Sequence, residues 1–234
     1  MQKQNNTVEL LEQVLGIKFT NKSILKVALT HSSFANQKKK VEYNERLEYL
    51  GDAVLELIIT EHLFKNCSDK SEGALTKIRS LIVCENSLYE IAQNLYLGKY
   101  MLMSKGEELT GGRERSSILA DCVEAVIAAI YLDKGLEVAR KFIIDNFQDI
   151  IERAIDNKII LDYKTKLQEV IQSKGEVSIN YNMLKSEGPA HRPTFEVQLV
   201  IDGENQSQGI GSSKKEAEQN AAKNMLTKME MKYE

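Results

Sequence analysis

Residues 44–64 read NERLEYLGDAVLELIITEHLF, a stretch in which apolar residues return every three or four positions. That period is typical of an α-helix with one buried side. The same spacing recurs in VELLEQVLGI, SILKVAL, GALTKIRSLIV, ENSLYEIAQNLYL, SSILADCVEAVIAAIYL and VARKFIIDNFQDII. Both prolines of the chain, Pro189 and Pro193, lie later, so none interrupts these segments. We therefore expect residues 1–155 to form an all-α domain of about eight helices.

Three acids, Glu45, Glu48 and Asp52, fall within about 60° of one another on a helical projection of this stretch. They border a predicted apolar stripe made of Leu47, Leu50, Val54 and Leu57. One interpretation is an ordinary helix start, in which Asn44 caps the helix and the acids after it interact favourably with the helix dipole. That interaction stabilises the helix by about 0.3 to 1 kcal/mol. Asp52 lies two turns further on and is not explained in this way. The alternative is that the acids are ligands.

A second acidic pair lies in SSILADCVEAVIAAIYL, residues 116–132, where Asp121 and Glu124 are the only charged residues. A helix this apolar is buried on nearly all sides, and an unpaired buried carboxylate costs several kcal/mol. Two helices with acidic faces could converge on a hard divalent cation, Mg²⁺ or Mn²⁺, which favours oxygen ligands. Such a cluster suits phosphodiester hydrolysis. Gly51 weakens its helix by about 1 kcal/mol relative to Ala, which indicates close approach of another backbone or a ligand.

The loop LTGGRER places Gly111 and Gly112 before Arg113 and Arg115. It is either a flexible basic loop that faces a phosphate chain or a plain surface turn. With only three histidines, His31, His62 and His191, a histidine-based acid–base site is hard to assemble.

The chain as a whole has the composition of a globular protein, with 234 residues and a net charge of −3. It has no run of about 20 apolar residues, and its N-terminus lacks the pattern of a secretory signal, so we expect a cytoplasmic protein without a membrane domain. Cys67, Cys84 and Cys122 are odd in number and lack CxxC spacing, which indicates free thiols. A nucleic-acid partner would have to be bound by local basic patches.

The pattern changes after a predicted linker at residues 156–161. A helical DYKTKLQEVIQSKG is followed by SINYNMLKSEG and then by TFEVQLVI, whose alternation indicates a half-buried strand. Asp202-Gly203 is a hairpin-turn dipeptide, ENQSQGIG supplies a returning strand, and a last helix begins near Ser213. We therefore expect a small α+β domain of order α-β-β-β-α at residues 162–234.

Several of these motifs together resemble the bacterial ribonuclease III family. NERLEYLGD is similar to the family signature and ILADCVEAVIAAIYLD to its second acidic motif, while ALTHSSFAN and KGEELTGGRERSSILAD also look like that family. The C-terminal segment resembles a double-stranded RNA-binding domain. The resemblance covers nearly the whole chain in order, and it implies an all-α endonuclease domain followed by that module.

The resemblance also implies roles for particular acids. Glu48, Asp52, Asp121 and Glu124 would form a Mg²⁺ site that Mn²⁺ can also fill, with Asp52 and Glu124 as the catalytic pair. Glu45, and Glu72 in SEGALTKIRS, would act near the RNA or in the outer shell of the metal.

Tyr49 stands where the family commonly has Phe, at a position that packs across a dimer interface. A C2 homodimer would present one site to each antiparallel strand of duplex RNA. The family implies cleavage of both strands, with 5′-phosphate and 3′-hydroxyl ends and short 3′ overhangs. It also implies a role in processing rRNA precursors and some mRNA and tRNA transcripts.

Three features of the C-terminal module are suited to duplex RNA. One is a polar helix face that could reach 2′-hydroxyls, made of Thr165, Gln168, Glu169 and Gln172. The second is the proline-stiffened loop GPAHRPTF, which presents His191 and Arg192.

The third feature is the start of the last helix, where Ser213 and Glu216 form a capping-box pattern around Lys214 and Lys215. The positive charge of lysines in a first turn is unfavourable beside the positive end of the helix dipole. A phosphate bound at this helix start would make it favourable. Glu218 stands where many such domains have another basic residue, which predicts modest affinity. Residues 162–234 hold ten basic and eleven acidic side chains, so recognition has to be local.

Two other functions are compatible with parts of the pattern. A helical, magnesium-dependent nucleotide pyrophosphohydrolase would explain the carboxylates but not the RNA-binding module. A non-catalytic RNA binder would explain the module but has no need of four acids.

Overall fold

The N-terminal two thirds of the chain are helical, as the periodicity predicts. The computed structural model describes residues 2–37, 41–156, 159, 162–173, 176–189 and 193–230. The chain divides into two compact units, Met1–Ile159 and Ile160–Glu234. The described helices of the first unit are α1 (Gln2–Leu15), α2 (Lys22–Ala28), α3 (Ser32–Ala35), α4 (Glu45–Asn66), α5 (Glu72–Ile82), α6 (Glu85–Asn94), α7 (Leu97–Tyr100), α8 (Lys105–Leu109), the 3₁₀ helix η1 (Gly112–Glu114), α9 (Ser116–Lys134) and α10 (Leu136–Ile155).

This unit contains more helices than the eight or so that the sequence predicts. The additional ones are short: α3 and α7 have four residues and α8 has five. Segments of that length complete barely one turn, so they show no apolar period that could be recognised in the sequence. The fold class itself is confirmed.

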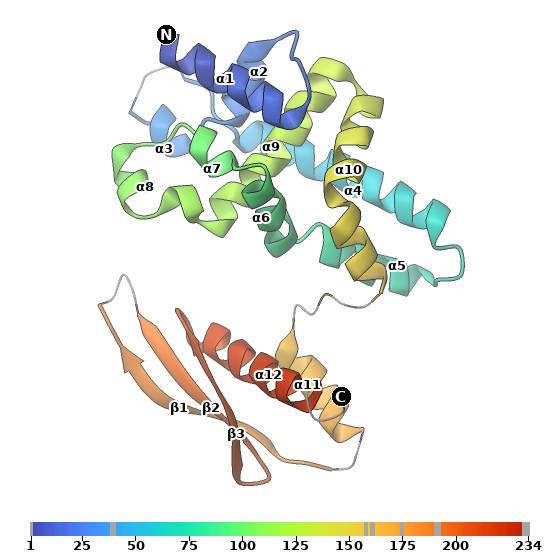
Figure 1. Ribbon diagram of the computed structural model, residues 1–234, viewed down its shortest axis with the longest axis vertical. Coiled ribbons are helices and arrows are strands. Elements are labelled where there is room, and N and C mark those ends of the chain that lie inside the picture. The colour runs from blue at the N-terminus through green and yellow to red at the C-terminus, as the bar shows by residue number, and fades with distance from the viewer. Residues whose placement is uncertain are drawn as a thin grey trace. The chain divides into compact units, whose positions relative to one another are not determined.

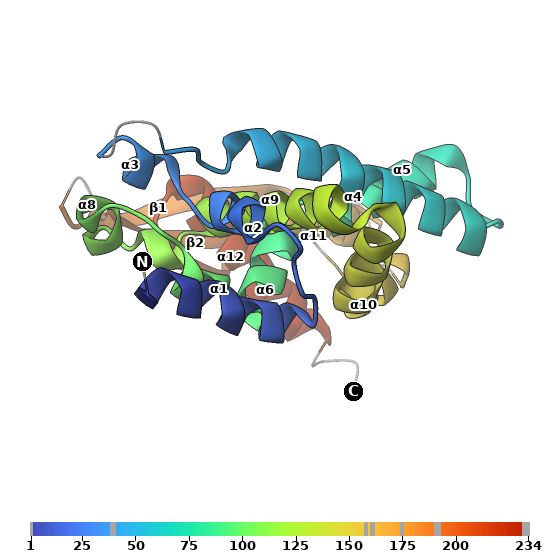
Figure 2. The ribbon, with the colours of Figure 1, turned by 90° about the horizontal axis from the view of Figure 1, so that it is seen from above.

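Helix α9 lies at the centre of the first unit, beside α4 (Figures 1 and 2). From Ile118 to Ile130 its apolar residues are buried, whereas Leu132 near its end is 52% exposed, so the prediction of burial on nearly all sides is confirmed. They include Ile118, Leu119, Cys122, Val123, Val126, Ile127 and Ile130. Along α4, Leu55, Ile58 and Ile59 are fully buried, whereas Leu57 is 56% exposed. The prediction that Leu57 faces the core was therefore wrong.

The second unit has the predicted order α-β-β-β-α. Its elements are α11 (Tyr163–Gln172), β1 (Ile179–Glu187), β2 (Thr194–Ile201), β3 (Glu204–Gly211) and α12 (Lys214–Glu230). The strands form an antiparallel sheet in the order β1-β2-β3. Both helices cover one face of it (Figure 1), around a core that includes Leu167, Leu199 and Leu226.

The hairpin between β2 and β3 turns at Asp202 and Gly203, as predicted. Both residues have positive φ, 50° and 84°, which a two-residue turn matched to the twist of the strands requires. On β3, Gly209 lies against α12, where a Cβ would come within 2.2 Å of the Ala217 carbonyl oxygen. The helix therefore rests directly on the sheet.

In the part of the chain that the structure describes, no helix combines the length and apolar character that crossing a membrane requires. All three cysteines are free thiols, as expected.

Candidate metal centre and nucleic-acid interface

The acidic site lies where the backbones of α4 and α9 touch. A Cβ on Gly51 would stand 1.8 Å from the carbonyl oxygen of Glu124, so any side chain at this position would push the helices apart. Of the two alternatives predicted for Gly51, close approach of another backbone or of a ligand, the structure shows the backbone. This contact brings the acids of α4 next to those of α9.

Three carboxylates converge at this contact: Glu48 from α4, and Asp121 and Glu124 from α9. Each offers one oxygen atom, and these oxygens all lie within 4.8 Å of one another. All three side chains are half-buried. Asp52 is one turn beyond Glu48 on α4, but it is exposed and lies outside this group of three. The structure therefore brings together three of the four acids expected to hold a metal.

Desolvation and mutual repulsion raise the pKa of each of these three carboxyls. Burial is the largest cause of the rise in the pKa of Glu124 to about 8, and the charges of Asp52, Glu48 and Asp121 add to it. The pKa of Glu48 and that of Asp121 are also raised, again chiefly by burial. Asp52 thus acts on the cluster electrostatically although it lies outside it.

No lysine or arginine forms an ion pair with these acids among the described residues. Closely spaced, partly desolvated carboxylate oxygens without a positive partner are the donor set that a hard divalent cation takes. The residues present therefore fit such an ion.

Other charged groups surround Asp121. Glu45 and Glu85 raise its pKa further, whereas the charge of His31 lowers it. The carboxylate of Glu85 accepts a hydrogen bond from the Ser116 hydroxyl at 2.5 Å. Glu85 was not predicted, because α6 and α9 meet here only through tertiary packing and no local spacing in the sequence reveals that contact.

Asn44 and Glu72 differ from the simplest expectations. Asn44 occupies the N-cap position of α4, but its backbone is helical and its side chain makes no capping hydrogen bond. The prediction that the Asn44 side chain caps the helix was therefore wrong, although Glu45 and Glu48 do lie in the first turn of α4. Glu72 begins α5, where its carboxylate accepts a hydrogen bond from the Thr76 hydroxyl at 3.0 Å, and it is not part of the acidic cluster. It lines a separate cavity of about 470 Å³ with Phe64, Leu75 and other residues.

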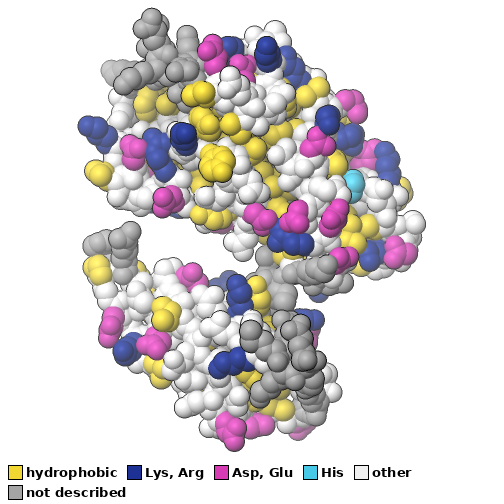
Figure 3. Space-filling model, viewed as in Figure 1, with side chains coloured by type: hydrophobic (Ala, Val, Ile, Leu, Met, Phe, Trp, Pro, Cys, Tyr) yellow, Lys and Arg dark blue, Asp and Glu magenta, His cyan; other side chains and the backbone are white. Residues whose placement is uncertain are grey.

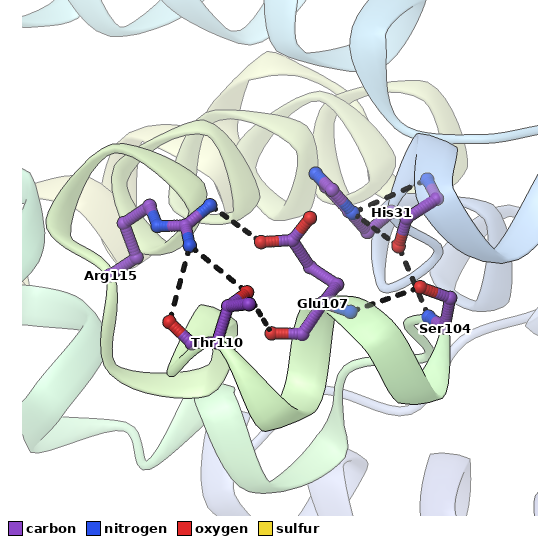
Figure 4. Close-up of polar contacts among 6 residues, drawn as sticks. His31, Ser104, Glu107, Thr110 and Arg115 are labelled. Carbon is purple, nitrogen blue, oxygen red and sulfur yellow. Dashed lines mark hydrogen bonds and ion pairs between the residues drawn. The ribbon is translucent and has the colours of Figure 1, made fainter. Parts of the chain in front are cut away.

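The glycine-rich loop between α8 and α9 is held by its own acids. Arg115 pairs with Glu107 at 2.5 Å and also donates to Thr110 (Figure 4). Arg113 pairs with Glu108 at 2.5 Å and donates to the Gly98 and Met101 carbonyl oxygens. Both guanidinium groups are thus engaged within the protein, which favours the surface-turn interpretation over a flexible basic loop.

His31 is tied to the same region (Figure 4). Its Nδ1 lies 2.8 Å from the Ser33 hydroxyl, and that hydroxyl oxygen accepts the backbone N–H of Ser104 at 3.1 Å. Ser104 in turn caps α8 by accepting the N–H of Glu107. The chain of bonds connects α3 to α8 and fixes the orientation of the imidazole near Asp121.

The outer face of α4 carries exposed apolar side chains. Tyr49 is 82% exposed and Leu57 56% exposed. A cavity of about 620 Å³ lies beside the N-terminal half of this helix. Its apolar lining includes Ile24, Val27, Leu47, Leu50 and Leu132.

In the second unit, the predicted polar face of α11 is solvent-exposed. Its members are Thr165, Gln168, Glu169 and Gln172. The Thr165 hydroxyl donates to Asp162 at 2.7 Å, and the backbone N–H of Thr165 donates to the same carboxylate, which caps the helix. His191 and Arg192 lie outside the described residues.

At the start of α12, Lys214 and Lys215 are exposed and Ser213 caps the helix through the N–H of Glu216 at 3.1 Å. The carboxylate of Glu216 binds the hydroxyl and N–H of Ser212. The capping-box pattern predicts that this carboxylate accepts a hydrogen bond from the backbone N–H of Ser213. Here it accepts the backbone N–H of Ser212 instead. Basic and acidic side chains are interspersed over the face of the chain seen in Figure 3, which agrees with its small net charge of −3.

Comparisons with known proteins divide the chain in the same way. A family model described as Ribonuclease-III-like matches residues 21–150, and one described as double-stranded RNA binding motif matches residues 163–229. A curated relative from Clostridium perfringens, called Ribonuclease 3, is 61% identical over 99% of this chain and 98% of its own length. A Ribonuclease 3 from Clostridium kluyveri is 57% identical over 96% of this chain and 92% of its own.

A solved structure is similar to the first unit. It is the nuclease domain of ribonuclease III from Campylobacter jejuni, whose description names a region involved in dimer formation. The two are 46% identical, with a TM-score of 0.57, over 61% of this chain and 96% of that one.

Proposed function

The chain belongs to the ribonuclease III family and is an endoribonuclease with a double-stranded RNA-binding module, and from this we propose that it cuts both strands of duplex RNA with the aid of Mg²⁺. The products would carry 5′-phosphate and 3′-hydroxyl ends with short 3′ overhangs. The observation that supports this most directly is the convergence of Glu48, Asp121 and Glu124 within 4.8 Å.

The proposed ion would be held by Glu48, Asp121 and Glu124, with Asp52 as the fourth acid. When bound, it would supply an activated water and neutralise charge on the phosphodiester oxygens. Mn²⁺ prefers similar oxygen ligands and should substitute. The raised pKa of Glu124, about 8, means that this carboxyl carries a proton near neutral pH until a cation offsets its neighbours.

We assign Asp52 and Glu124 as the catalytic pair. Asp52 is exposed, so it can reach a bound phosphodiester, and its charge is the largest Coulombic influence on Glu124. Glu45 is exposed beside Glu48 and would contact RNA or outer-shell water. Glu72 is assigned the same kind of role, although in this structure it lies in a different cavity.

The second unit would bind the RNA duplex by its shape. The exposed face of α11 would meet 2′-hydroxyls in the minor groove, and Lys214 and Lys215 would meet phosphates at the start of α12. His191 and Arg192 are assigned to the minor groove on the resemblance alone. Substrates would include rRNA precursors and some mRNA and tRNA transcripts. We place the enzyme in the cytoplasm, because three free thiols are typical of a reducing compartment.

We further propose that the enzyme acts as a homodimer with Tyr49 in the interface. An aromatic side chain that is 82% exposed, on the same helix as the 56% exposed Leu57, is typical of a surface that another chain covers. The exposed Tyr49 hydroxyl can stay at the wet edge of such an interface. Two identical sites related by a two-fold axis would match the two antiparallel strands of the substrate.

The experiment is to incubate the protein with long duplex RNA and with free nucleotides, with and without Mg²⁺. We expect metal-dependent release of short duplexes with phosphate at the 5′ ends. Glu124→Gln on α9 should abolish most cleavage and leave RNA binding nearly unchanged. The control Glu56→Gln, which removes an exposed acid on α4, should leave cleavage normal. Hydrolysis of nucleotides without RNA cleavage would refute the proposal.

A further inference from the structure

Glu218 on α12 lies between two lysines of the RNA-binding module. Its Oε2 is 2.6 Å from the Lys164 ammonium on α11, and its Oε1 is 3.9 Å from the Lys214 ammonium one turn before it. The Glu218 side chain is only 14% exposed, whereas the two lysine side chains are 35% and 61% exposed. The carboxylate is therefore held in the crevice between the helices, with one oxygen toward each lysine.

The contact with Lys164 is the tighter of the two. The Lys164 ammonium also lies 4.6 Å from the centre of the Tyr181 ring on β1, within the range of a cation–π contact. Burial chiefly raises the pKa of Tyr181 to about 12, and the charge of Glu218 contributes. A short, partly desolvated pair with aromatic support keeps Lys164 with Glu218. Lys164 is thus occupied by the fold itself.

The contact with Lys214 is long and largely exposed, and such a pair contributes little. Lys214 can therefore exchange Glu218 for another anion. Lys215, the next residue, forms no ion pair among the described residues. Near the start of α12, Lys164 is therefore held by Glu218, Lys214 contacts Glu218 only loosely, and Lys215 is open to solvent.

We propose that Glu218 sets the affinity of this module for duplex RNA by competing with a backbone phosphate for Lys214. This rests on the proposed role of the α12 start as a phosphate site. In the free protein Glu218 offsets part of the charge of Lys214, and RNA has to displace that contact. The module alone then binds weakly, so firm binding needs additional contacts from a long duplex or a second copy of the chain.

The test is a measurement of duplex RNA binding by the full chain in EDTA, with a gel to verify that the RNA stays intact. Glu218→Gln should bind about two- to fivefold more tightly at low salt, the gain that an exposed ion pair of up to about 1 kcal/mol allows. Its log–log salt dependence should steepen by up to about one unit, corresponding to one more phosphate contact. Glu204→Gln removes the same charge from an exposed position at the start of β3 and should change binding less.

Two variants separate this effect from a loosening of the module. Lys164→Gln breaks the same link between α11 and α12 but leaves Glu218 beside Lys214, so it should give no gain in affinity. In a Lys214→Gln background, Glu218→Gln should also give no gain, because the two residues act as a coupled pair. A gain that persists without Lys214, or no gain in a folded Glu218→Gln protein, would overturn the inference. If the unaltered chain does not bind duplex RNA at all, the proposed function fails and this inference fails with it.

Discussion

Replacing Glu124 with Gln should stabilise the metal-free protein, because the acidic cluster opposes folding. The pKa of this carboxyl rises from an ordinary 4.5 to about 8 in the folded state. A carboxyl whose folded pKa is raised destabilises the fold above its unfolded pKa. The penalty is absent below about pH 4, grows as the pH rises from 4.5 to 8, and is constant at higher pH.

The size of the effect follows from the shift. A change of one in the pKa corresponds to about 1.36 kcal/mol of free energy. Solvent screens part of that energy because the Glu124 side chain is only half-buried. The expected gain in the free energy of unfolding is therefore roughly 2 to 3 kcal/mol at pH 7 and roughly 3 to 4 kcal/mol at pH 9. A glutamine of the same shape keeps the packing against α4.

The assay is urea unfolding in EDTA at pH 4, 7 and 9, followed by circular dichroism. Glu56→Gln, an exposed change on α4, should shift stability by no more than about 0.5 kcal/mol at each pH. Mg²⁺ at one hundred times its dissociation constant should stabilise the unaltered protein by about 2.7 kcal/mol and the Glu124→Gln variant much less. A gain that is equal at all three pH values, or a loss of stability at pH 9, would refute the reasoning.

Four further changes test other parts of the molecule. Asp52→Asn should reduce cleavage of duplex RNA by at least about a hundredfold, the usual scale of a lost acid–base group, while a gel-shift assay shows binding retained; normal cleavage would contradict its assignment. Lys214→Ala with Lys215→Ala should weaken binding equally for different duplex sequences and flatten the log–log salt dependence by up to about two units, whereas an effect on a single sequence would indicate base readout. Tyr49→Ala should shift the chain toward monomer in sedimentation and Tyr49→Phe should not, so an unchanged association state in the alanine variant would place the interface elsewhere. Gly51→Ala should lower the melting temperature by several degrees or prevent folding, because the new methyl group would overlap the Glu124 carbonyl; an unchanged melting temperature would show that the helices separate easily.

The sequence predicted those parts of the site that depend on the pattern within one helix. Asp121 and Glu124 were recognisable because they are the only charges in an otherwise apolar stretch, and Gly51 because a glycine is unfavourable inside a helix. The hairpin at Asp202 was equally local, since its turn type needs two residues that tolerate positive φ.

What the sequence missed depends on tertiary contacts. Leu57 follows the apolar period of α4, yet it is exposed, because periodicity cannot say which faces of a helix receive a neighbour. The hydrogen bond from Ser116 to Glu85 joins residues from separate helices. The engagement of Arg113 and Arg115 by Glu108 and Glu107 depends on how a short loop folds back, which charge spacing alone does not determine.

The contact between Gly51 and Glu124 also bears on when the acidic cluster can form. Glu48 precedes α5 to α8 in the chain, and Asp121 and Glu124 follow them, so the two parts of the acidic cluster are synthesised at different times. An emerging chain that has made only α4 holds half of a site and cannot cluster the three carboxylates. The cluster of Glu48, Asp121 and Glu124, and with it the proposed metal site, can therefore form only after α9 has left the ribosome and docked against α4.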